Sequence, residues 1–226
     1  MKTLAIPSFL LALTMLLAGC EKDNYEPPKS TLTGRVVYQN QPIGVRSNGV
    51  QLELWQRGYQ LFTKIPVYVD QDGSFSASLF DGDYQLVRLR GNGPWVDNTD
   101  TIKVQVRGTA TVEVPVQPYY VVKNEMIQKS GNAVTATAKI DPVVTSRAIE
   151  RVTLYLGSTT IVDANNNAGT HNLTGTALAD LSKTLSFSVT VPASLANKEY
   201  AFARIGVKTV GVAEMLYSPV QKVALK

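Results

Sequence analysis

From Thr31 to the C-terminus, apolar and polar residues alternate along almost every segment, and this period of two constrains the fold more than any other feature. Successive side chains of a strand point to opposite faces, so the alternation is typical of strands that bury one face. Gly, Pro, Asn and Asp interrupt it at short intervals, and no helical repeat is sustained. The sequence therefore predicts an all-β chain whose antiparallel strands pack as two β-sandwich domains.

The first expected domain spans residues 31–117. Its expected strands are residues 32–38, 50–55, 65–69, 75–79, 84–89, 102–106 and 111–116. Asp70-Gln71-Asp72-Gly73 and Asp81-Gly82 supply the residue types that tight hairpin turns prefer. The first of these also has two of the oxygen ligands of a calcium loop. It lacks the third acidic position and the closing glutamate, so we expect a turn and no metal site.

A second domain is expected at residues 118–226. Pro115, Pro118, Tyr119 and Tyr120 mark the boundary, and we expect the two tyrosines to pack the joint between the domains. The expected strands of this domain are residues 134–140, 152–156, 185–191, 201–207 and 220–225. Residues 157–180 have little periodicity and are rich in Asn, Gly and Thr, which predicts a long loop with a short helical turn at 176–181.

The order of motifs in the first domain resembles the carboxypeptidase-regulatory-like, transthyretin-type sandwich. The residues that carry this resemblance are Gly34, Pro42, Gly44, Asp72, Gly73, Phe75, Gly82 and Tyr84. In the second domain, residues 200–207 followed by 217–220 resemble the final two strands of a fibronectin-III or immunoglobulin-like sandwich. All these motifs are structural, so the resemblance implies a fold and no particular activity.

The amino terminus has the features of a targeting segment. A weakly positive start precedes an apolar run at residues 4–17, which is too short for a stable membrane span. The run ends in Leu17-Ala18-Gly19-Cys20, which resembles the lipobox of bacterial lipoproteins, and Cys20 is the only cysteine. A lipidated thiol is consumed and leaves no reactive group exposed. We therefore expect a signal peptide at residues 1–19 and a lipid anchor to the outer membrane on Cys20.

Residues 20–30 are polar and contain two prolines, so a flexible tether is expected between the anchor and the first domain. Acidic residues soon after the lipidated cysteine resemble the surface-export signal of Bacteroidota lipoproteins. The resemblance implies a position on the cell surface, with the periplasmic face as the alternative.

Several classes of function are disfavoured by composition. The formal net charge of +4 is scattered without a basic run, so nucleic acid is not an expected partner. His171 is the only histidine and lies in an expected loop. The sequence has no nucleophile motif with which it could form a catalytic triad. A single histidine is also too few ligands for a zinc site, which is therefore not expected. No phosphate or dinucleotide fingerprint is present, and no cofactor is expected. Most carboxylates lie in turns, which disfavours a hydrolase with paired acids.

Aromatic residues among polar neighbours are the best candidates for binding. The candidate ligand-binding residues are Trp95, Trp55, Tyr59, Tyr68, Asn92 and Asp97. An indole can stack on the flat face of a pyranose while amides and carboxylates bind the sugar hydroxyls. Two alternatives remain open: Trp95 as a plug over the end of the sandwich, and Trp55 turned toward the second domain.

The whole arrangement resembles a family of two-domain Bacteroidota lipoproteins, domain of unknown function 3823, whose members tend to be encoded beside TonB-dependent, starch-utilisation-type uptake systems. The resemblance implies a non-catalytic component that binds an oligo- or polysaccharide, or assists its uptake, with a TonB-dependent transporter as partner. The alternative is a structural role as a fimbrial subunit or envelope spacer. Fimbrillins are also two-domain lipoproteins and mature by cleavage after an arginine, for which Arg35, Arg46 and Arg57 are candidates.

Overall fold

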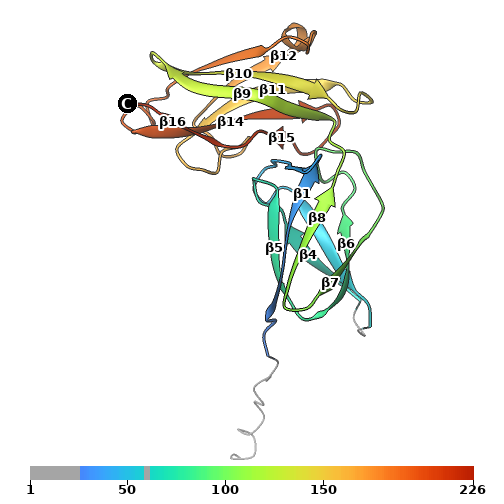
Figure 1. Cartoon of the computed structure of the whole chain (residues 1–226). Coiled ribbons are helices and arrows are strands. Elements are labelled where there is room, and N and C mark those ends of the chain that lie inside the picture. The colour runs from blue at the N-terminus through green and yellow to red at the C-terminus, as the bar shows by residue number, and fades with distance from the viewer. Residues whose placement is uncertain (1–25, 59–61) are drawn as a thin grey trace, which may run out of the picture.

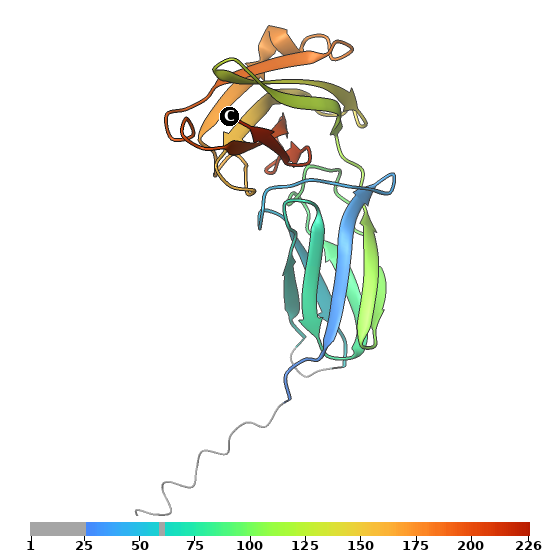
Figure 2. The same cartoon turned by 60° about the vertical axis from the view of Figure 1, so that its left-hand side comes forward.

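The computed structural model describes residues 26–58 and 62–226. The expected signal peptide and Cys20 lie outside the described residues, as does Tyr59. The described part is all-β, which confirms the predicted class: it contains strands β1–β16 and one 3₁₀ turn, η1. The strands form two sandwich domains, and the second domain lies across one end of the first (Figures 1 and 2).

The first domain consists of two four-stranded sheets that enclose one apolar core. One sheet contains β2 (Gln41–Pro42), β1 (Ser30–Tyr38), β5 (Ser74–Leu79) and β8 (Thr109–Pro115). The other contains, in spatial order, β4 (Lys64–Tyr68), β3 (Gln51–Gln56), β6 (Gly82–Arg88) and β7 (Ile102–Val106). Leu32, Leu52, Leu54 and Leu86 are fully buried between the sheets, as the alternation predicts.

One pairing in this domain differs from the expected antiparallel order. β8 follows β7 but joins the opposite sheet, where it pairs with β1 in parallel from Thr31↔Thr109 to Val37↔Pro115. Because β1 and β8 run in the same direction, the chain enters the domain at one end and leaves it at the other. The N-terminal segment and the second domain therefore lie at opposite ends of the first domain (Figure 1).

The second domain is also a sandwich with its own apolar core. Its smaller sheet contains, in spatial order, β13 (Leu185–Thr190), β10 (Ala133–Pro142) and β9 (Tyr120–Ser130). Its larger sheet contains β12 (Gly169–Thr174), β11 (Ile149–Gly157) and β14 (Tyr200–Thr209), and β14 also pairs with the short β15 (Leu216–Tyr217) and with β16 (Gln221–Ala224). Leu154, Leu156, Leu195 and Ile205 are fully buried in its core.

Besides the two-residue β15, two longer strands of this domain were not expected from the sequence. β9 and β12 lie at the edges of the two sheets, where polar side chains are tolerated on both faces, and their sequences therefore alternate poorly. The prediction of a loop over residues 157–180 is wrong at Gly169–Thr174, which is strand β12. The predicted helical turn is present as η1 (Gly175–Leu178), slightly earlier than expected.

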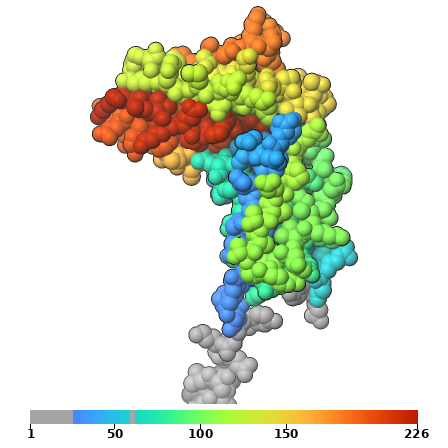
Figure 3. All heavy atoms as spheres, viewed as in Figure 1, coloured from blue at the N-terminus to red at the C-terminus, as the bar shows by residue number. Residues whose placement is uncertain are grey.

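The joint between the domains is closely packed. Leu216 of β15 belongs to the apolar core of the first domain, and Tyr217 donates its backbone N–H to the carbonyl of Gly44 at 2.9 Å. A Cβ atom at position 44 would lie 2.4 Å from the Tyr217 carbonyl oxygen, so only glycine permits this approach. In the space-filling view the segment after β1 meets the C-terminal strands directly (Figure 3). This contact gives a physical reason for Gly44, one of the residues on which the resemblance to the transthyretin-type sandwich depends.

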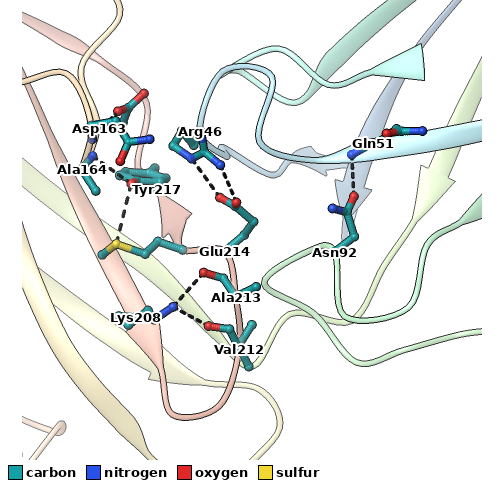
Figure 4. A network of polar contacts seen from close by, with 12 residues as sticks. Arg46, Gln51, Asn92, Asp163, Ala164, Lys208, Val212, Ala213, Glu214 and Tyr217 are labelled. Atoms are coloured by element: carbon teal, nitrogen blue, oxygen red, sulfur yellow. Dashed lines mark hydrogen bonds and ion pairs between the residues drawn. The ribbon is translucent and has the colours of Figure 1, made fainter. Parts of the chain in front are cut away.

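Polar side chains at the joint form hydrogen bonds between the two domains. Arg46 contacts both carboxylate oxygens of Glu214, at 2.6 and 3.3 Å (Figure 4). Arg204 of β14 is 1% exposed and donates to the carbonyls of Ser218, Val45 and Gln71. Its guanidinium also lies 4.4 Å from the centre of the Tyr217 ring. Burial lowers the pKa of Arg204 to about 10, which leaves the side chain charged at neutral pH.

Candidate functional site

The candidate site is the outer face of the sheet β4-β3-β6-β7 in the first domain. We call it the Trp55 face. Strand register places Lys64, Trp55, Gln85 and Lys103 in one row across the four strands. Side chains of alternate residues share a face, so this row points away from the core that Leu54 and Leu86 fill. Trp55 thus lies outside the core, and its contacts with Glu53 and Phe62 and the hollow beside it lie within the first domain, so it does not turn toward the second.

An aromatic pair lies at the centre of this face. The rings of Trp55 and Phe62 are 5.0 Å apart between centroids and tilted by 40°. Phe62 is 52% exposed, so the pair presents apolar ring surface to solvent. Sequence analysis did not identify Phe62, because its position before β4 lies in a short irregular segment with no alternation.

The Trp55 ring is held in position by a buried carboxylate. Glu53 is 6% exposed and accepts a hydrogen bond from the indole Nε1 of Trp55 at 3.1 Å. Its other oxygen accepts from Lys64 Nζ at 2.6 Å. Both carboxylate oxygens of Glu53 are thus engaged, and the ring is held by its polar edge. Such a fixed ring loses little conformational freedom when a ligand stacks on it.

A second row lies next to the first. Asp83 and Gln105 are opposite each other in the register of β6 and β7, and the amide of Gln105 donates to Asp83 at 3.0 Å. Arg57 follows β3 at the same end of the sheet. Trp55, Arg57, Asp83, Gln85, Lys103 and Gln105 line one open hollow of about 490 Å³. The hollow thus combines one indole with amide, carboxylate and cationic groups.

Tyr68 lies on the same face but at the other end of β4. It is 51% exposed and pairs in register with Gln51, four residues from Trp55 along β3. At about 3.4 Å per residue, the two rings are separated by roughly 13 Å along the strand. The face therefore presents aromatic groups over a length greater than that of one sugar ring.

Trp95 and its neighbours do not join this face. Trp95 is 4% exposed, and a Cβ atom on Gly93 would lie 2.2 Å from its ring, so the loop backbone packs directly on the indole. Asn92 accepts a hydrogen bond from the backbone N–H of Gln51, and Asp97 accepts one from the backbone N–H of Gly91. These side chains fix the loop.

The Trp95 loop is part of the joint. Trp95 forms an isolated bridge with Pro118, and the N–H of Val96 donates to the carbonyl of Gln117 at 2.9 Å. Tyr119 and Tyr120 are buried in the core of the second domain next to this bridge. The plug interpretation of Trp95 thus describes its position in the structure, and its ring presents no open face for stacking.

The remaining sequence candidates, the Asp70–Gly73 segment and His171, form hydrogen bonds that stabilise the fold. The Asp70–Gly73 segment is a hairpin turn in which Asp72 accepts hydrogen bonds from the backbone N–H and hydroxyl of Ser74. His171 lies in β12 and not in a loop, and its Nδ1 accepts from the backbone N–H of Ser188 at 3.1 Å. Within residues 26–58 and 62–226, no group of three or more His, Cys, Asp and Glu side chains is arranged to hold a metal ion.

A narrower groove of about 180 Å³ lies between the domains. Its floor consists of residues that join the two domains, including Gly44, Leu216 and Tyr217. Because these residues are already engaged with one another, we assign the groove to the joint.

No helix in the described part of the chain has the length and hydropathy to cross a membrane.

The fold and the site together define a tandem β-sandwich protein with an exposed aromatic sheet face. Two family models match it: the N-terminal domain of a protein of unknown function (DUF3823) matches residues 30–117, and a domain of unknown function (DUF3823_C) matches residues 120–222. The chain belongs to the DUF3823 family. This confirms the family resemblance found in the sequence.

Solved structures agree with this assignment. A DUF3823 family protein from Bacteroides ovatus is 42% identical, with a TM-score of 0.82, and one from Parabacteroides merdae is 35% identical, with a TM-score of 0.80. In both cases the alignment covers 88% of this chain and 100% of the other. A presumed carbohydrate-binding protein from Bacteroides uniformis has the same fold, with a TM-score of 0.71 at 18% identity and the same coverage. No curated protein is detectably similar in sequence to this chain.

Proposed function

We propose that this protein binds glycans through the Trp55 face and serves a polysaccharide uptake system as a non-catalytic component. The observation that carries the proposal is the Trp55–Phe62 pair on an open sheet face: Trp55 is half-buried and fixed by Glu53, Phe62 is exposed, and hydrogen-bonding side chains line the hollow beside Trp55. Exposed rings occur elsewhere on the chain, for example Tyr200, so the distinguishing feature of this face is the combination of the ring pair with a polar hollow beside it. The three similar structures carry no enzyme name, and one is named for carbohydrate binding, which supports this class of function.

The geometry suits a sugar chain better than a compact ligand. A pyranose has an apolar face of C–H groups and a rim of hydroxyls, so it needs an aromatic platform with polar groups beside it. Trp55 supplies the platform, and Gln85 and Gln105 supply amides in the adjoining hollow. The hollow is open and the face is long, which permits a polymer to pass across it.

We also propose that Cys20 anchors the protein to the outer membrane, with both domains on the cell surface. The described chain begins at the end of the first domain that is opposite the second domain (Figure 2). An anchor at Cys20 would therefore place the first domain nearest the membrane. Mass spectrometry of the mature chain tests the acylation, and protease accessibility on intact cells tests the exposure. A non-acylated Cys20, or protection of both domains, would refute this part of the proposal.

The structural alternative receives less support from the fold. Maturation of the fimbrillin type requires cleavage after an arginine, but Arg35 lies within β1, paired on one side with β5 and on the other with β8. Arg46 is engaged with Glu214 at the joint. A protease would reach either of these two arginines only after local unfolding of the sandwich. Arg57, the third candidate, is exposed just after β3, so cleavage there would test this alternative.

Binding to a panel of plant and host polysaccharides, by affinity electrophoresis and calorimetry, tests the glycan proposal. We expect retardation by at least one glycan, and we expect Trp55→Ala to weaken it about tenfold or more, because the stacked apolar area is lost. Phe62→Ala should weaken it less, since Trp55 remains.

Tyr200→Ala serves as the matched control, because Tyr200 is a 41% exposed ring on the second domain. This variant should bind as the unmodified protein does. The proposal is wrong if no glycan in the panel is bound, or if Trp55→Ala binds as tightly as the Tyr200 variant.

A further inference from the structure

The hollow beside Trp55 contains an excess of positive charge. Glu53 is neutralised by Lys64 at 2.6 Å, and Asp83 faces Arg107 at 3.6 Å. Arg57 and Lys103 line the same hollow, and within the described residues the side chain of neither takes part in a hydrogen bond or an ion pair. Two exposed cations therefore face the hollow without a carboxylate partner.

Their positions relative to the indole are set by the sheet. Lys103 lies in the same row as Trp55, two strands away, which corresponds to about 10 Å between the strand axes. Arg57 lies two residues beyond Trp55 along the chain, or roughly 7 Å. One cation thus lies to the side of the ring across the strands, and the other lies along the strand. A sugar stacked on Trp55 would have both beside its rim.

We propose that the ligand of the Trp55 face is an acidic glycan, in which a carboxylate or a sulfate ester on the sugar ring pairs with Arg57 and Lys103. The inference rests on the proposed function and specifies its substrate class. Anionic substituents of a pyranose project from the rim of the ring, so stacking on the indole directs them toward the sides of the hollow. Guanidinium and ammonium groups bind such oxygens with charge-assisted hydrogen bonds.

The amides in the hollow fit the same ligand. Gln85 lies between Trp55 and Lys103 in the row, and Gln105 lies beside Asp83 in the next row. Amides donate and accept, so they can bind the hydroxyls that remain next to the anionic group. Asp83 already accepts from Gln105 and faces Arg107, which reduces its repulsion of an anion.

The test compares glycans that differ only in charge. Polygalacturonate and its methyl ester share one backbone, and chondroitin and chondroitin sulfate differ only in the sulfate ester. We expect the full chain to bind at least one anionic form more tightly than its less charged counterpart, with an affinity that falls as salt is raised. The first pair reports a carboxylate requirement, and the second reports a contribution from sulfate.

Variants that remove one positive charge each then test whether Arg57 and Lys103 cause the preference for anionic glycans. Arg57→Gln and Lys103→Gln should each lower the affinity for the preferred anionic glycan by about two- to fivefold, as expected for exposed ion pairs, and should leave binding of the methyl ester unchanged. Lys139→Gln is the matched control, because Lys139 is an exposed cation on β10 of the second domain. It should alter neither affinity.

The outcomes separate this inference from the proposed function. Equal affinity for charged and uncharged glycans, with Trp55→Ala still abolishing binding, would overturn the inference and leave glycan binding in place. Normal binding of anionic glycans by the Arg57→Gln, Lys103→Gln double variant would also overturn it. Failure of every glycan to bind would overturn the proposed function itself.

Discussion

The two tryptophans of this chain have opposite surroundings. Trp95 is 4% exposed, covered by the backbone of Gly93 and bridged to Pro118 at the joint. Trp55 lies on an open sheet face, where its ring contacts the exposed Phe62 and its Nε1 donates to Glu53. In the sequence both are isolated indoles near polar residues. The difference teaches that a polar neighbourhood along the chain does not show whether a ring faces solvent.

The same contrast separates the two ends of the first domain. The end with Trp95 is occupied by the second domain, and its polar side chains are bound to one another or to backbone groups. The end with Trp55 has side chains that remain free to meet a ligand. We therefore expect substitutions at the joint to reduce stability and substitutions on the Trp55 face to reduce binding.

The largest effect is expected for Trp95→Ala. Removing a buried indole leaves a cavity, and such substitutions lower the free energy of unfolding by about 3–5 kcal/mol. Urea denaturation measures this loss, and glycan affinity of the folded fraction should be unchanged. Reduced affinity in a folded Trp95→Ala protein would break the distinction between the two tryptophans.

Arg204→Met should lower the free energy of unfolding by about 1–3 kcal/mol, because it removes the side-chain donor to the buried carbonyls of Val45 and Ser218. The Gln71 carbonyl also loses this donor but keeps the backbone N–H of Val45. Methionine preserves much of the side-chain volume, so the effect reports the lost hydrogen bonds. Urea denaturation gives the magnitude, and small-angle scattering should detect looser coupling of the domains. An unchanged unfolding free energy would mean that the joint depends on apolar contacts such as Leu216 alone.

Phe62→Ala should change the free energy of unfolding by no more than about 0.5 kcal/mol, because the side chain is more than half exposed. Glycan affinity should nevertheless decrease. Thermal unfolding and calorimetry on the same preparation measure both quantities. A large loss of stability without loss of affinity would assign Phe62 a structural role like that of Trp95.

The smallest effect is expected from acid. The Ser74 hydroxyl lowers the pKa of Asp72 below its ordinary value of 3.8, and the Ser30 hydroxyl does the same for Asp81, with the Gly108 N–H as a second donor. Each carboxylate has a lower pKa in the folded state, so its contribution is complete above about pH 4 and is lost as the pH falls through the folded-state pKa. Unfolding free energies measured between about pH 6 and pH 2.5 should show this decline.

Asp72→Asn and Asp81→Asn should each make the decline shallower. Asp72 lies in the turn next to the joint, and Asp81 joins the start of β1 to the turn after β7 at the other end of the domain. Comparing the two variants therefore shows which end of the first domain is more sensitive to acid. A pH profile that neither substitution alters would exclude both aspartates as its source.

Much of the fold could be predicted from the sequence, for a local reason. Alternation records which face of a strand is buried, so the central strands β3, β6, β10 and β14 were expected close to where they lie. The edge strands β9 and β12 were missed because an edge strand has no strict need to alternate. The parallel pairing of β1 with β8 was also missed, since it depends on which sheet the chain joins after β7.

The candidate site was predicted only in part. The alternation within each strand placed Trp55 and Tyr68 outside the core, and the pairing of β3 with β4 puts both on one face of the sheet. Trp95, Asn92 and Asp97 were grouped with them because they are polar and aromatic neighbours in a loop, yet that loop packs on the linker between the domains. Glu53 and Arg57 lie two residues before and after Trp55, so the alternation of the strand already places them on the same side as its ring. Phe62 reaches Trp55 from a separate segment, and no local pattern indicates that contact.

The sequence by itself determined the all-β class, the family and the expectation of a lipid-anchored chain, because periodicity, turn residues and a cleavage motif are written in consecutive positions. The tertiary structure alone decided which aromatic rings are open, which cations lack a partner, and how the domains are joined. These properties depend on residues far apart in the chain, such as Gly44 with Tyr217 and Trp55 with Lys103. The burial of a side chain and the pairing of its charge depend on residues that folding brings together, and the local sequence pattern does not predict which residues those are.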